Sequence, residues 1–380
     1  MIATDKRIRV LVVDDSTFMR RVVRSIISAD PGIEVVGEAR DGREAVAQSE
    51  SLRPDVITMD INMPNVDGLE ATEIIMSQNP RPILIVSSES REGTRGTLRA
   101  LELGAIDFVT KPSGAIDLDM NAVKDELTRK LKMAAKVRVV RTATRPKLKQ
   151  ITLAATKPLG SAVTRIVAAP TAALSADIAQ SDERCPIVVL AASTGGPATL
   201  MRLIPSFRKD FPAALLLALH MPANFTSQFT EQLAENSLIQ VKEAQPGDAV
   251  RPGTLYVCPG SHHLRVSPAG QLLLDDGPRI SGYRPCADAT LETVAAYAGP
   301  MAVGVVLTGM GNDAARGVMA VKAAGGHVIA QDEATSVIFG MPQEAIRTGA
   351  VDQVLPLDAI GPAIEKRVLY LLGAVKVGAL

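Results

Sequence analysis

The chain has 380 residues, and its 41 Lys and Arg residues balance its 41 Asp and Glu residues. This length is enough for two or three domains of roughly 150 residues each. Because 47% of the residues are hydrophobic, the composition excludes a disordered polyelectrolyte, which combines few apolar residues with a high net charge. The zero net charge argues against a surface built for nucleic acid, since such a surface needs a basic excess.

The three cysteines, Cys185, Cys258 and Cys286, lie far apart and form no CxxC pair, which favours a reducing compartment over a disulfide framework. The basic N-terminus is followed by an apolar run that is too short for a signal peptide. The longest apolar runs, such as residues 213–219, are far shorter than the about 18 residues of a membrane span. We therefore expect a cytoplasmic protein that does not insert into membranes.

Residues 1–137 alternate short β-branched runs with amphipathic stretches. This alternation predicts an α/β domain with a parallel sheet covered by helices on both faces. Such sheets bind ligands beyond the carboxyl ends of their strands. The predicted strands span residues 8–14, 33–38, 55–60, 83–87 and 106–110, and the predicted helices span 17–29, 42–51, 67–79, 91–103 and 117–136.

Residues 138–183 are predicted to be a basic flexible linker. Between residues 138 and 176 there are seven Lys or Arg residues and no acidic or aromatic residues, and Ala, Thr and Pro dominate the rest. Two interpretations stay open, a solvated tether and a segment that docks on an acidic partner surface.

Residues 184–380 resume the alternation and are predicted to form a second, doubly wound and mostly parallel α/β domain. Two short runs, 264–267 and 271–274, flank a Pro-Ala-Gly segment and predict a β-hairpin. The predicted strands span residues 187–191, 213–219, 254–258, 302–307 and 327–330, and the predicted helices span 197–206, 224–235, 286–298, 312–324 and 341–348.

An acidic group of residues falls at the predicted strand ends of residues 1–137. Asp14 and Asp15 end the first strand, Asp60 ends the third, and Ser87 and Lys111 lie at the ends of the fourth and fifth. Converging carboxylates suit Mg²⁺, and a metal with an ammonium group offsets the charge of a phosphoryl group attacked by a carboxylate. An Asp pair alone could equally be a helix N-cap, and a flavodoxin-like fold with acids by chance would leave Lys111 unexplained.

Four motifs in this region resemble the receiver domain of two-component response regulators, over about residues 5–125. The motifs are VDDS (13–16), MDINMPNVDGL (59–69), VSS (86–88) and TKP (110–112). The resemblance implies a flavodoxin-like, five-stranded parallel sheet with strand order 2-1-3-4-5. It implies Asp60 as phosphoacceptor, Asp14, Asp15 and Asp60 as Mg²⁺ ligands, Ser87 as switch hydroxyl, Lys111 as phosphate contact and Phe108 as switch aromatic.

The segment VVLAASTGGP (188–197) places Ser193 on a predicted strand-to-helix turn. Such a turn presents a nucleophilic hydroxyl at the edge of a sheet, and amides at a helix start stabilise an oxyanion. Alone, this turn could also be a phosphate-binding loop or a purely structural element.

Two further residues follow apolar runs in the same region. His220 directly follows the run AALLLAL, and Asp313 lies in TGMGNDAA after another such run. Alone, His220 could be structural and Asp313 a helix N-cap, but with Ser193 they favour a Ser-His-Asp triad in one crevice. The chain order Ser, His, Asp differs from that of α/β-hydrolases, so that fold is not assumed.

Several motifs of residues 184–372 resemble the methylesterase domain of the chemotaxis type. They are ASTGGP (192–197), HMPANFT (220–226), LRVSPAGQL (264–272), TGMGNDAA (308–315), IAQDEATSVIFGMP (329–342) and GAVDQVLPL (349–357). With a receiver and a linker before it, the whole chain resembles the family of chemotaxis response regulators that are protein-glutamate methylesterases.

The resemblance implies Ser193 as nucleophile, His220 as general base and then acid, and Asp313 as the residue that orients His220. It implies hydrolysis of glutamate γ-methyl esters on chemoreceptors, with release of methanol, and deamidation of receptor glutamines. The backbone N–H groups of Thr194 and Met310 are the candidates for the oxyanion hole.

The resemblance also implies control and partners. The unphosphorylated receiver is expected to pack over the esterase cleft, and a chemotaxis histidine kinase is expected to phosphorylate Asp60. We expect a monomer, with Mg²⁺ at the receiver, no cofactor for the esterase and no nucleic-acid partner. A hydrolase of a non-chemotaxis sensory pathway remains the alternative, and a DNA-binding response regulator is disfavoured because residues 184–380 contain no Lys/Arg clusters beyond pairs.

Two positions depart from the family pattern, Ala191 and Ala314, where glycine is usual. A turn that needs positive φ would be strained by alanine. His263 is expected to line the site and His327 to be structural. The spacing of His and Cys residues argues against a catalytic zinc, and Cys258 or Cys286 paired with His263 is a disfavoured alternative nucleophile.

Overall fold

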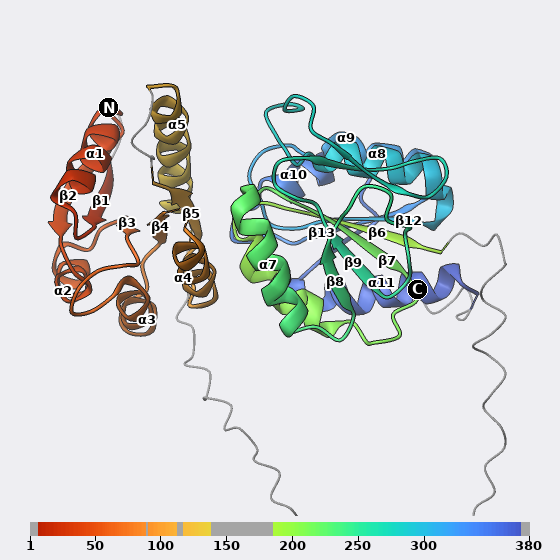
Figure 1. Ribbon diagram of the computed structural model, residues 1–380, viewed down its shortest axis with the longest axis horizontal. Coiled ribbons are helices and arrows are strands. Elements are labelled where there is room, and N and C mark those ends of the chain that lie inside the picture. The colour runs from red at the N-terminus through yellow and green to blue at the C-terminus, as the bar shows by residue number, and fades with distance from the viewer. Residues whose placement is uncertain (1–6, 89, 112–116, 138–184, 374–380) are drawn as a thin grey trace, which may run out of the picture. The chain divides into compact units, whose positions relative to one another are not determined.

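The computed structural model describes residues 7–88, 90–111, 117–137 and 185–373. The predicted linker, residues 138–183, lies outside the described residues. Two large parallel sheets organise the described residues, one before the linker and one after it (Figure 1).

The N-terminal sheet has five parallel strands in the order β2-β1-β3-β4-β5, which confirms the predicted order. Its strands are short, apolar and largely buried, as is typical of a sheet covered on both faces. The strands are β1 (Ile8–Val13), β2 (Ile33–Ala39), β3 (Val56–Met59), β4 (Ile83–Ser87) and β5 (Asp107–Thr110).

Helices cover both faces of this sheet. Alternate residues of β1 point to opposite faces, so that Val10 and Val12 pack with α1 and α5 while Leu11 and Val13 belong to the core under α2, α3 and α4. Side chains of Ser16, Asp41, Asp67 and Ser90 cap four of the helices at their N-termini. The helices are α1 (Thr17–Ser28), α2 (Gly42–Leu52), α3 (Gly68–Gln78), α4 (Arg91–Glu102) and α5 (Asp117–Ala134).

The C-terminal sheet has seven parallel strands in the order β14-β13-β12-β6-β7-β9-β8. Its central strands β6 and β7 are buried along their whole length. The order reverses direction beside β6, so the sheet is doubly wound as predicted. The strands are β6 (Ile187–Ala192), β7 (Ala214–Leu219), β8 (Gln240–Glu243), β9 (Thr254–Val257), β12 (Ala302–Val306), β13 (His327–Gln331) and β14 (Gln353–Leu355).

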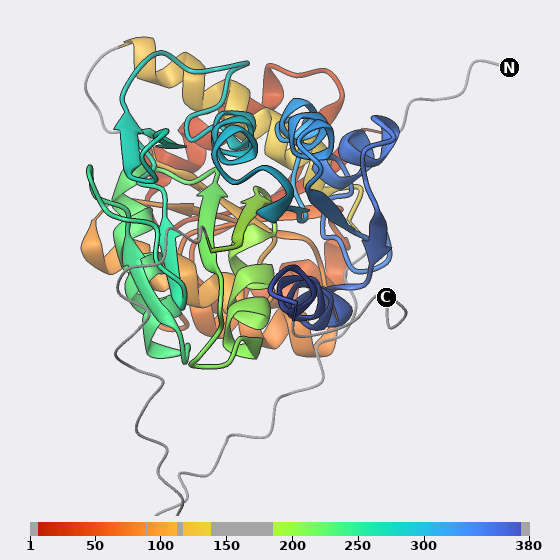
Figure 2. The same ribbon diagram turned by 90° about the vertical axis from the view of Figure 1, so that its right-hand side faces the viewer.

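Figure 2 shows helices on both sides of this sheet, with α8, α9 and α10 on one side and α6, α7 and α11 on the other. The predicted hairpin is present as β10 (His263–Val266) and β11 (Leu272–Asp275), and it packs on α8. The helices are α6 (Gly196–Leu203), α7 (Ala223–Glu235), α8 (Ala287–Ala298), α9 (Ala315–Ala323), α10 (Met341–Arg347) and α11 (Leu357–Leu371), and two 3₁₀ turns span Ile204–Ser206 and Gly299–Met301.

Among the described residues, two strands and one α-helix were not predicted from the sequence, namely β8, β14 and α11. The two strands lie at the edges of the sheet, are only three or four residues long and are mostly part-exposed, so they lack a buried apolar run. Helix α11 contains Gly361 and Pro362, a pair that normally marks a turn. Within the described residues, no helix is long and apolar enough to cross a bilayer.

Candidate active site and phosphoacceptor site

The candidate catalytic residues follow three neighbouring strands of the C-terminal sheet, β12, β6 and β7. Ser193 directly follows β6 and His220 directly follows β7, and the His220 N–H donates to the Ala192 carbonyl at 3.1 Å. The Ser193 N–H donates to the carbonyl of Thr308, just beyond β12, also at 3.1 Å. Carboxyl ends of parallel strands share one edge of a sheet, and here that edge brings Ser193 and His220 side by side.

His220 is paired with Asp313 at this edge. His220 Nε2 and Asp313 Oδ2 are 2.7 Å apart, and Asp313 is only 2% exposed. The carboxylate also accepts backbone hydrogen bonds from Ala287, Asp288 and Ala314, at 2.7, 2.9 and 2.9 Å. Two of these N–H groups belong to the first turn of α8, whose positive end favours a carboxylate.

These contacts decide the charge of the pair. Burial alone would raise the pKa of Asp313, but the hydrogen bond and charge of His220, together with the α8 amides, hold that pKa below its usual range. The ionised carboxylate fixes the proton of His220 on Nε2, which leaves Nδ1 as the basic nitrogen. In the described part of the chain, no hydrogen bond joins His220 to Ser193 Oγ; such bonds often tighten only when substrate is present.

The turn after β6 presents backbone N–H groups beside Ser193. Gly195 has φ +76°, and a Cβ there would lie 2.5 Å from the Val337 side chain, so this tight turn requires glycine. Among the described residues, the N–H groups of Thr194 and Met310 have no acceptor. Free N–H groups near a nucleophile are what an oxyanion hole requires, so the geometry supports these two candidates.

Alanine replaces the expected glycine at Ala191 and Ala314, and the backbone is strained at only one of these two positions. Ala191 lies inside β6, fully buried, and is absent from the residues with positive φ. Ala314 has φ +78° and is also fully buried, so it holds a backbone conformation that glycine adopts more easily. This conformation directs the Ala314 N–H at Asp313 Oδ1.

The acidic residues of the N-terminal sheet also converge. Ligand oxygens of Asp14, Asp15 and Asp60 lie within 4.8 Å of one another, and Lys111 Nζ lies 2.8 Å from both Asp14 Oδ2 and Asp60 Oδ2. An all-oxygen set of three carboxylates fits the preference of Mg²⁺. Ser87 is buried at the end of β4, where its hydroxyl donates to the Gly93 carbonyl at 3.2 Å.

The charge at this site is only partly balanced. Burial raises the pKa of Asp60, and the nearby Asp14 adds to the rise, although Lys111 opposes it. Burial disfavours the charge of Lys111, but its bonds to Asp14 and Asp60 outweigh that effect and raise the pKa of Lys111. The site therefore holds more carboxylate charge than its lysine neutralises, which favours a bound cation.

Phe108 is buried and its ring stacks on Phe225 of α7, with ring centroids 4.3 Å apart and an interplanar angle of 22°. The neighbouring Asp107 carboxylate accepts a 2.7 Å hydrogen bond from the hydroxyl of Thr194. On its other oxygen, Asp107 is paired with Lys130 at 3.2 Å. The candidate switch aromatic thus lies next to a residue that contacts the nucleophile turn.

The prediction that His263 lines the site is wrong. His263 is fully buried at the start of β10, and its Nε2 lies 3.1 Å from the Pro278 carbonyl. His327 is paired with Asp352, with Nδ1 and Oδ2 3.3 Å apart, which agrees with a structural role. Burial raises the thiol pKa of Cys258, and burial with Asp313 raises the thiol pKa of Cys286 to about 12, so both thiols stay protonated and unreactive.

Sequence reasoning missed two residues that contact the candidate triad. Tyr283 stacks on the His220 ring, and Cys286 Sγ lies 3.2 Å from Asp313 Oδ1. Both lie in the segment before α8, whose sequence has no motif that points to the triad. Cys286, Asp288 and Asp313 also form a group of metal-ligand type, but backbone N–H groups already occupy the carboxylate oxygens of Asp313.

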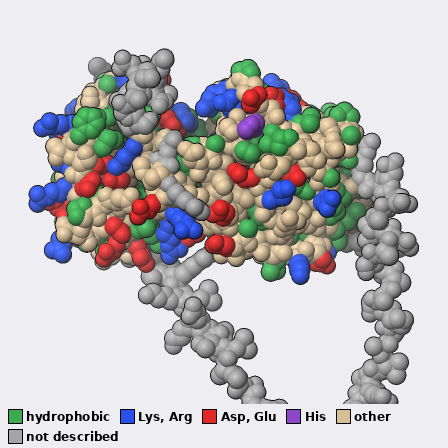
Figure 3. Space-filling model, in the orientation of Figure 1, with side chains coloured by type: hydrophobic (Ala, Val, Ile, Leu, Met, Phe, Trp, Pro, Cys, Tyr) green, Lys and Arg blue, Asp and Glu red, His purple; other side chains and the backbone are tan. Residues whose placement is uncertain are grey.

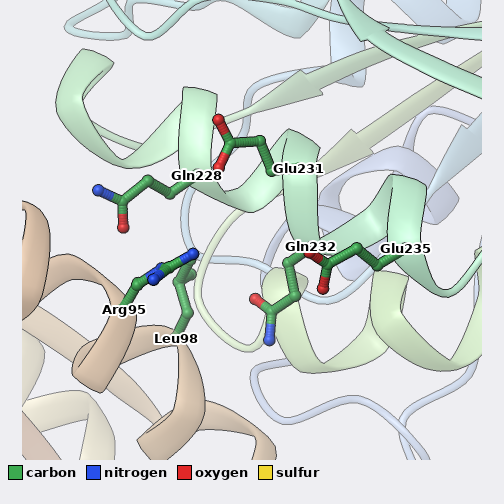
Figure 4. A pocket seen from close by; sticks show the side chains of 6 residues that line it. All are labelled: Arg95, Leu98, Gln228, Glu231, Gln232 and Glu235. Carbon is green, nitrogen blue, oxygen red and sulfur yellow. The ribbon is translucent and has the colours of Figure 1, made fainter.

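A cleft of about 260 Å³ lies between α4 and α7 (Figure 4). Its walls carry side chains that are mostly polar or charged, and none of them belongs to either candidate site. The lining residues are Arg95, Leu98, Gln228, Glu231, Gln232 and Glu235. Acidic and basic side chains are also interspersed over the face shown in Figure 3.

Comparison with known proteins gives two family matches. Residues 10–123 match the response regulator receiver domain, and residues 188–364 match the CheB methylesterase family. The protein-glutamate methylesterase/protein-glutamine glutaminase of Pyrococcus horikoshii is 44% identical over 383 residues, covering 98% of this chain and 97% of that protein. The protein of the same name from Symbiobacterium thermophilum is 44% identical over 364 residues, covering 95% of this chain and 97% of that protein.

Among solved structures, the catalytic domain of Thermotoga maritima CheB methylesterase is similar to this chain at 40% identity and a TM-score of 0.47, covering 48% of this chain and 99% of that one. Both relatives carry the same name, and each is more than 40% identical to this chain over nearly the full length of both proteins. The chain therefore belongs to the family of protein-glutamate methylesterases/protein-glutamine glutaminases, which join a response regulator receiver domain to a CheB methylesterase domain.

Proposed function

We propose that this protein is a phosphorylation-regulated serine hydrolase that demethylates glutamate γ-methyl esters of chemoreceptors and deamidates receptor glutamines. The observation that carries the proposal is the 2.7 Å pair of His220 and Asp313 beside the Ser193 turn, at one edge of the sheet, in a chain of this family. We assign residues 1–137 to the receiver domain, 138–183 to a linker and 184–380 to the catalytic domain.

Ser193 is the nucleophile in this mechanism. His220 Nδ1 takes the proton of the Ser193 hydroxyl as its oxygen attacks the γ-carbonyl carbon. The N–H groups of Thr194 and Met310 stabilise the oxyanion that forms, and Asp313 stabilises the imidazolium. The tetrahedral intermediate collapses as His220 returns the proton to the leaving group, which departs as methanol from an ester or as ammonia from an amide.

Water completes the reaction. His220 takes a proton from a water molecule, which attacks the acyl-enzyme carbonyl and forms a second tetrahedral intermediate. Collapse of that intermediate breaks the bond to Ser193 Oγ, which regains its proton from His220. The products are a free glutamate side chain and the regenerated hydroxyl.

Phosphorylation of Asp60 controls the reaction in this proposal. Asp14, Asp15 and Asp60 would hold Mg²⁺, which when bound offsets the charge on the phosphoryl oxygens. An Asp60 carboxylate oxygen attacks the phosphorus of a phosphohistidine on a histidine kinase of the sensory pathway, so the O–P bond forms as the N–P bond breaks and the kinase histidine leaves. The contacts from Asp107 to Thr194 and from Phe108 to Phe225 support hindrance of the nucleophile turn by the unphosphorylated receiver. We further propose that the protein acts as a monomer in the cytoplasm, without nucleic acid.

Methanol release from methylated receptor tests the hydrolase. Purified protein is incubated with receptor, with and without a small-molecule phosphodonor. Wild type should release methanol faster with the phosphodonor, and Ser193→Ala should lower the rate by at least about 10³-fold. Unchanged release by Ser193→Ala would contradict the triad, and no release by either protein would contradict the proposed substrate.

The same assay tests control by phosphorylation. Asp60→Asn should keep the unstimulated rate and lose the response to phosphodonor, because the amide is not a phosphoacceptor. Removal of residues 1–137 should raise the unstimulated rate. A full phosphodonor response in Asp60→Asn, or a lower rate after removal of the receiver, would contradict this control.

A further inference from the structure

The ring of Tyr283 covers one face of the His220 imidazole. The two ring centroids are 4.5 Å apart and the planes differ by 15°, which is a parallel stack. The edge of the same imidazole is held by Asp313 through Nε2. His220 is therefore fixed on an edge and on a face, by residues from two different loops.

The position of Tyr283 is itself tightly determined. Ile280 and Tyr283 exchange two backbone hydrogen bonds, at 3.0 and 2.9 Å, around a two-residue turn in which Ser281 and Gly282 have φ +51° and +88°. The Arg284 guanidinium ties the start of this loop by donating to the carbonyls of residues 276 and 277, at 3.0 Å each.

The hydroxyl end of Tyr283 fills the space above Gly311. A Cβ at Gly311, whose φ is +93°, would lie 1.9 Å from the Tyr283 hydroxyl oxygen. Glycine at this position is thus explained by the close approach of the tyrosine. Gly311 is next to Met310, so Tyr283 reaches from His220 to the loop that carries the candidate oxyanion N–H.

One short segment holds both members of the His-Asp pair. Tyr283 packs on His220, and three residues later Cys286, Ala287 and Asp288 begin the set of donors to Asp313. An aromatic face carries partial negative charge and attracts a cation placed against it. His220 becomes such a cation each time it accepts a proton during the reaction.

We infer that Tyr283 is a positioning residue that holds the His220 ring for proton transfer and stabilises its protonated form through the aromatic face. This inference rests on the proposed function, because it takes His220 as the general base. The effect on His220 comes from the aromatic ring of Tyr283 and not from its hydroxyl.

Among the described residues, the charged and titratable groups near His220 come from three elements. Asp313 faces its edge, and behind Asp313 lie the Cys286 thiol and the Asp288 carboxyl. From α5, the guanidinium of Arg129 reaches Met310, with Nη1 2.8 Å from Sδ. Burial raises the pKa of the Tyr283 phenol, so this group stays neutral around pH 7 and its own titration does not overlap with that of an imidazole.

The test titrates His220 directly, by NMR of its ring nitrogens in the full-length protein. Tyr283→Leu should move the His220 titration midpoint to lower pH by about half a unit, the size expected for loss of a cation–π contact. Tyr283→Phe is the matched control, because it keeps the aromatic face and loses the hydroxyl, and its midpoint should stay at the wild-type value. Thermal unfolding of each variant checks that it is folded.

Methanol release gives the second readout. In Tyr283→Leu, kcat/KM should fall about fivefold and the acid limb of its pH profile should move to lower pH, whereas Tyr283→Phe should match wild type. An unmoved His220 midpoint in Tyr283→Leu, or an equal shift in Tyr283→Phe, overturns the inference. The NMR midpoint is independent of substrate, so absence of methanol release by wild type would count against the proposed function alone.

Discussion

Asp60 and Asp313 both lie beyond the carboxyl end of a buried parallel strand, in two sheets built in the same way. Around Asp60 the nearest groups are the carboxylates of Asp14 and Asp15, the ammonium of Lys111 and one backbone N–H, that of Ile61. Around Asp313 they are three backbone N–H groups, a thiol and the imidazole of His220. Burial therefore prevails at Asp60 and raises its pKa, whereas donors prevail at Asp313 and lower its pKa.

This difference shows how one place in a fold serves two chemistries. A carboxylate short of donors, and close to other carboxylates, is prepared for a cation and a phosphoryl group that arrive from outside. A carboxylate already satisfied by the protein is unsuited to that task, but in the proposed mechanism it holds a histidine in one orientation through a full catalytic cycle. In the proposed mechanism, the donors supplied by the chain thus distinguish the phosphoacceptor Asp60 from the orienting residue Asp313.

Exchange of each carboxylate for an amide should separate the two sites most strongly when methanol release is measured. Asp313→Asn should lower kcat by about 10⁴-fold, because the amide no longer fixes the tautomer of His220 or stabilises its protonated form. Asp60→Asn, the matched change in the other sheet, should leave the unstimulated kcat within about twofold. Retention of more than about a tenth of the activity in Asp313→Asn would remove the distinction between the two sites.

The same two variants should shift stability in opposite directions at pH 7. Asp60→Asn should raise the free energy of unfolding by on the order of 1 kcal/mol, because it removes a buried charge that the fold disfavours. Asp313→Asn should lower it by about 2 kcal/mol, because charge-assisted hydrogen bonds are lost. Denaturant unfolding of both variants measures these differences.

The pH dependence of these differences follows from the two pKa directions. A raised native pKa means that the Asp60 charge costs stability above that pKa, so the gain in Asp60→Asn should fade as the pH falls towards 4. A lowered native pKa means that Asp313 stabilises the fold above its unfolded pKa, and this contribution is lost as the pH falls through the native value. Shifts of the same sign at pH 7 would contradict the account.

A weaker effect is expected from the backbone of Ala314, whose N–H donates to Asp313. Ala314→Gly should raise the free energy of unfolding by roughly 0.5 kcal/mol, because relief of left-handed strain slightly exceeds the loss of one buried methyl group. Ala191→Gly, the same change inside β6, should lower it by about 1 kcal/mol, since no strain is relieved there. Equal effects of the two changes would show that the positive φ of Ala314 is not a source of strain.

The ends of buried strands could be predicted from the sequence, whereas edge strands and an irregular loop could not. Strand cores and the residues directly after them, such as Asp60, Ser193 and His220, were predicted because buried parallel strands are continuous apolar runs that end in polar residues. The edge strands β8 and β14 were not predicted because they are short and part-exposed. The contacts of Tyr283 with His220 and of Cys286 with Asp313 were not predicted. They depend on the path of an irregular loop, for which neither periodicity nor spacing gives a signal.

Trapping the covalent intermediates tests whether Ser193 is the nucleophile and Asp60 the phosphoacceptor. Protein incubated with methylated receptor and a small-molecule phosphodonor is quenched rapidly in acid, and its peptides are mapped by mass spectrometry. We expect an acyl group on Ser193 and a phosphoryl group on Asp60, with the acyl adduct retained in Asp60→Asn and absent in Ser193→Ala. An acyl group on a cysteine or on Asp60, or one that persists in Ser193→Ala, would contradict these assignments.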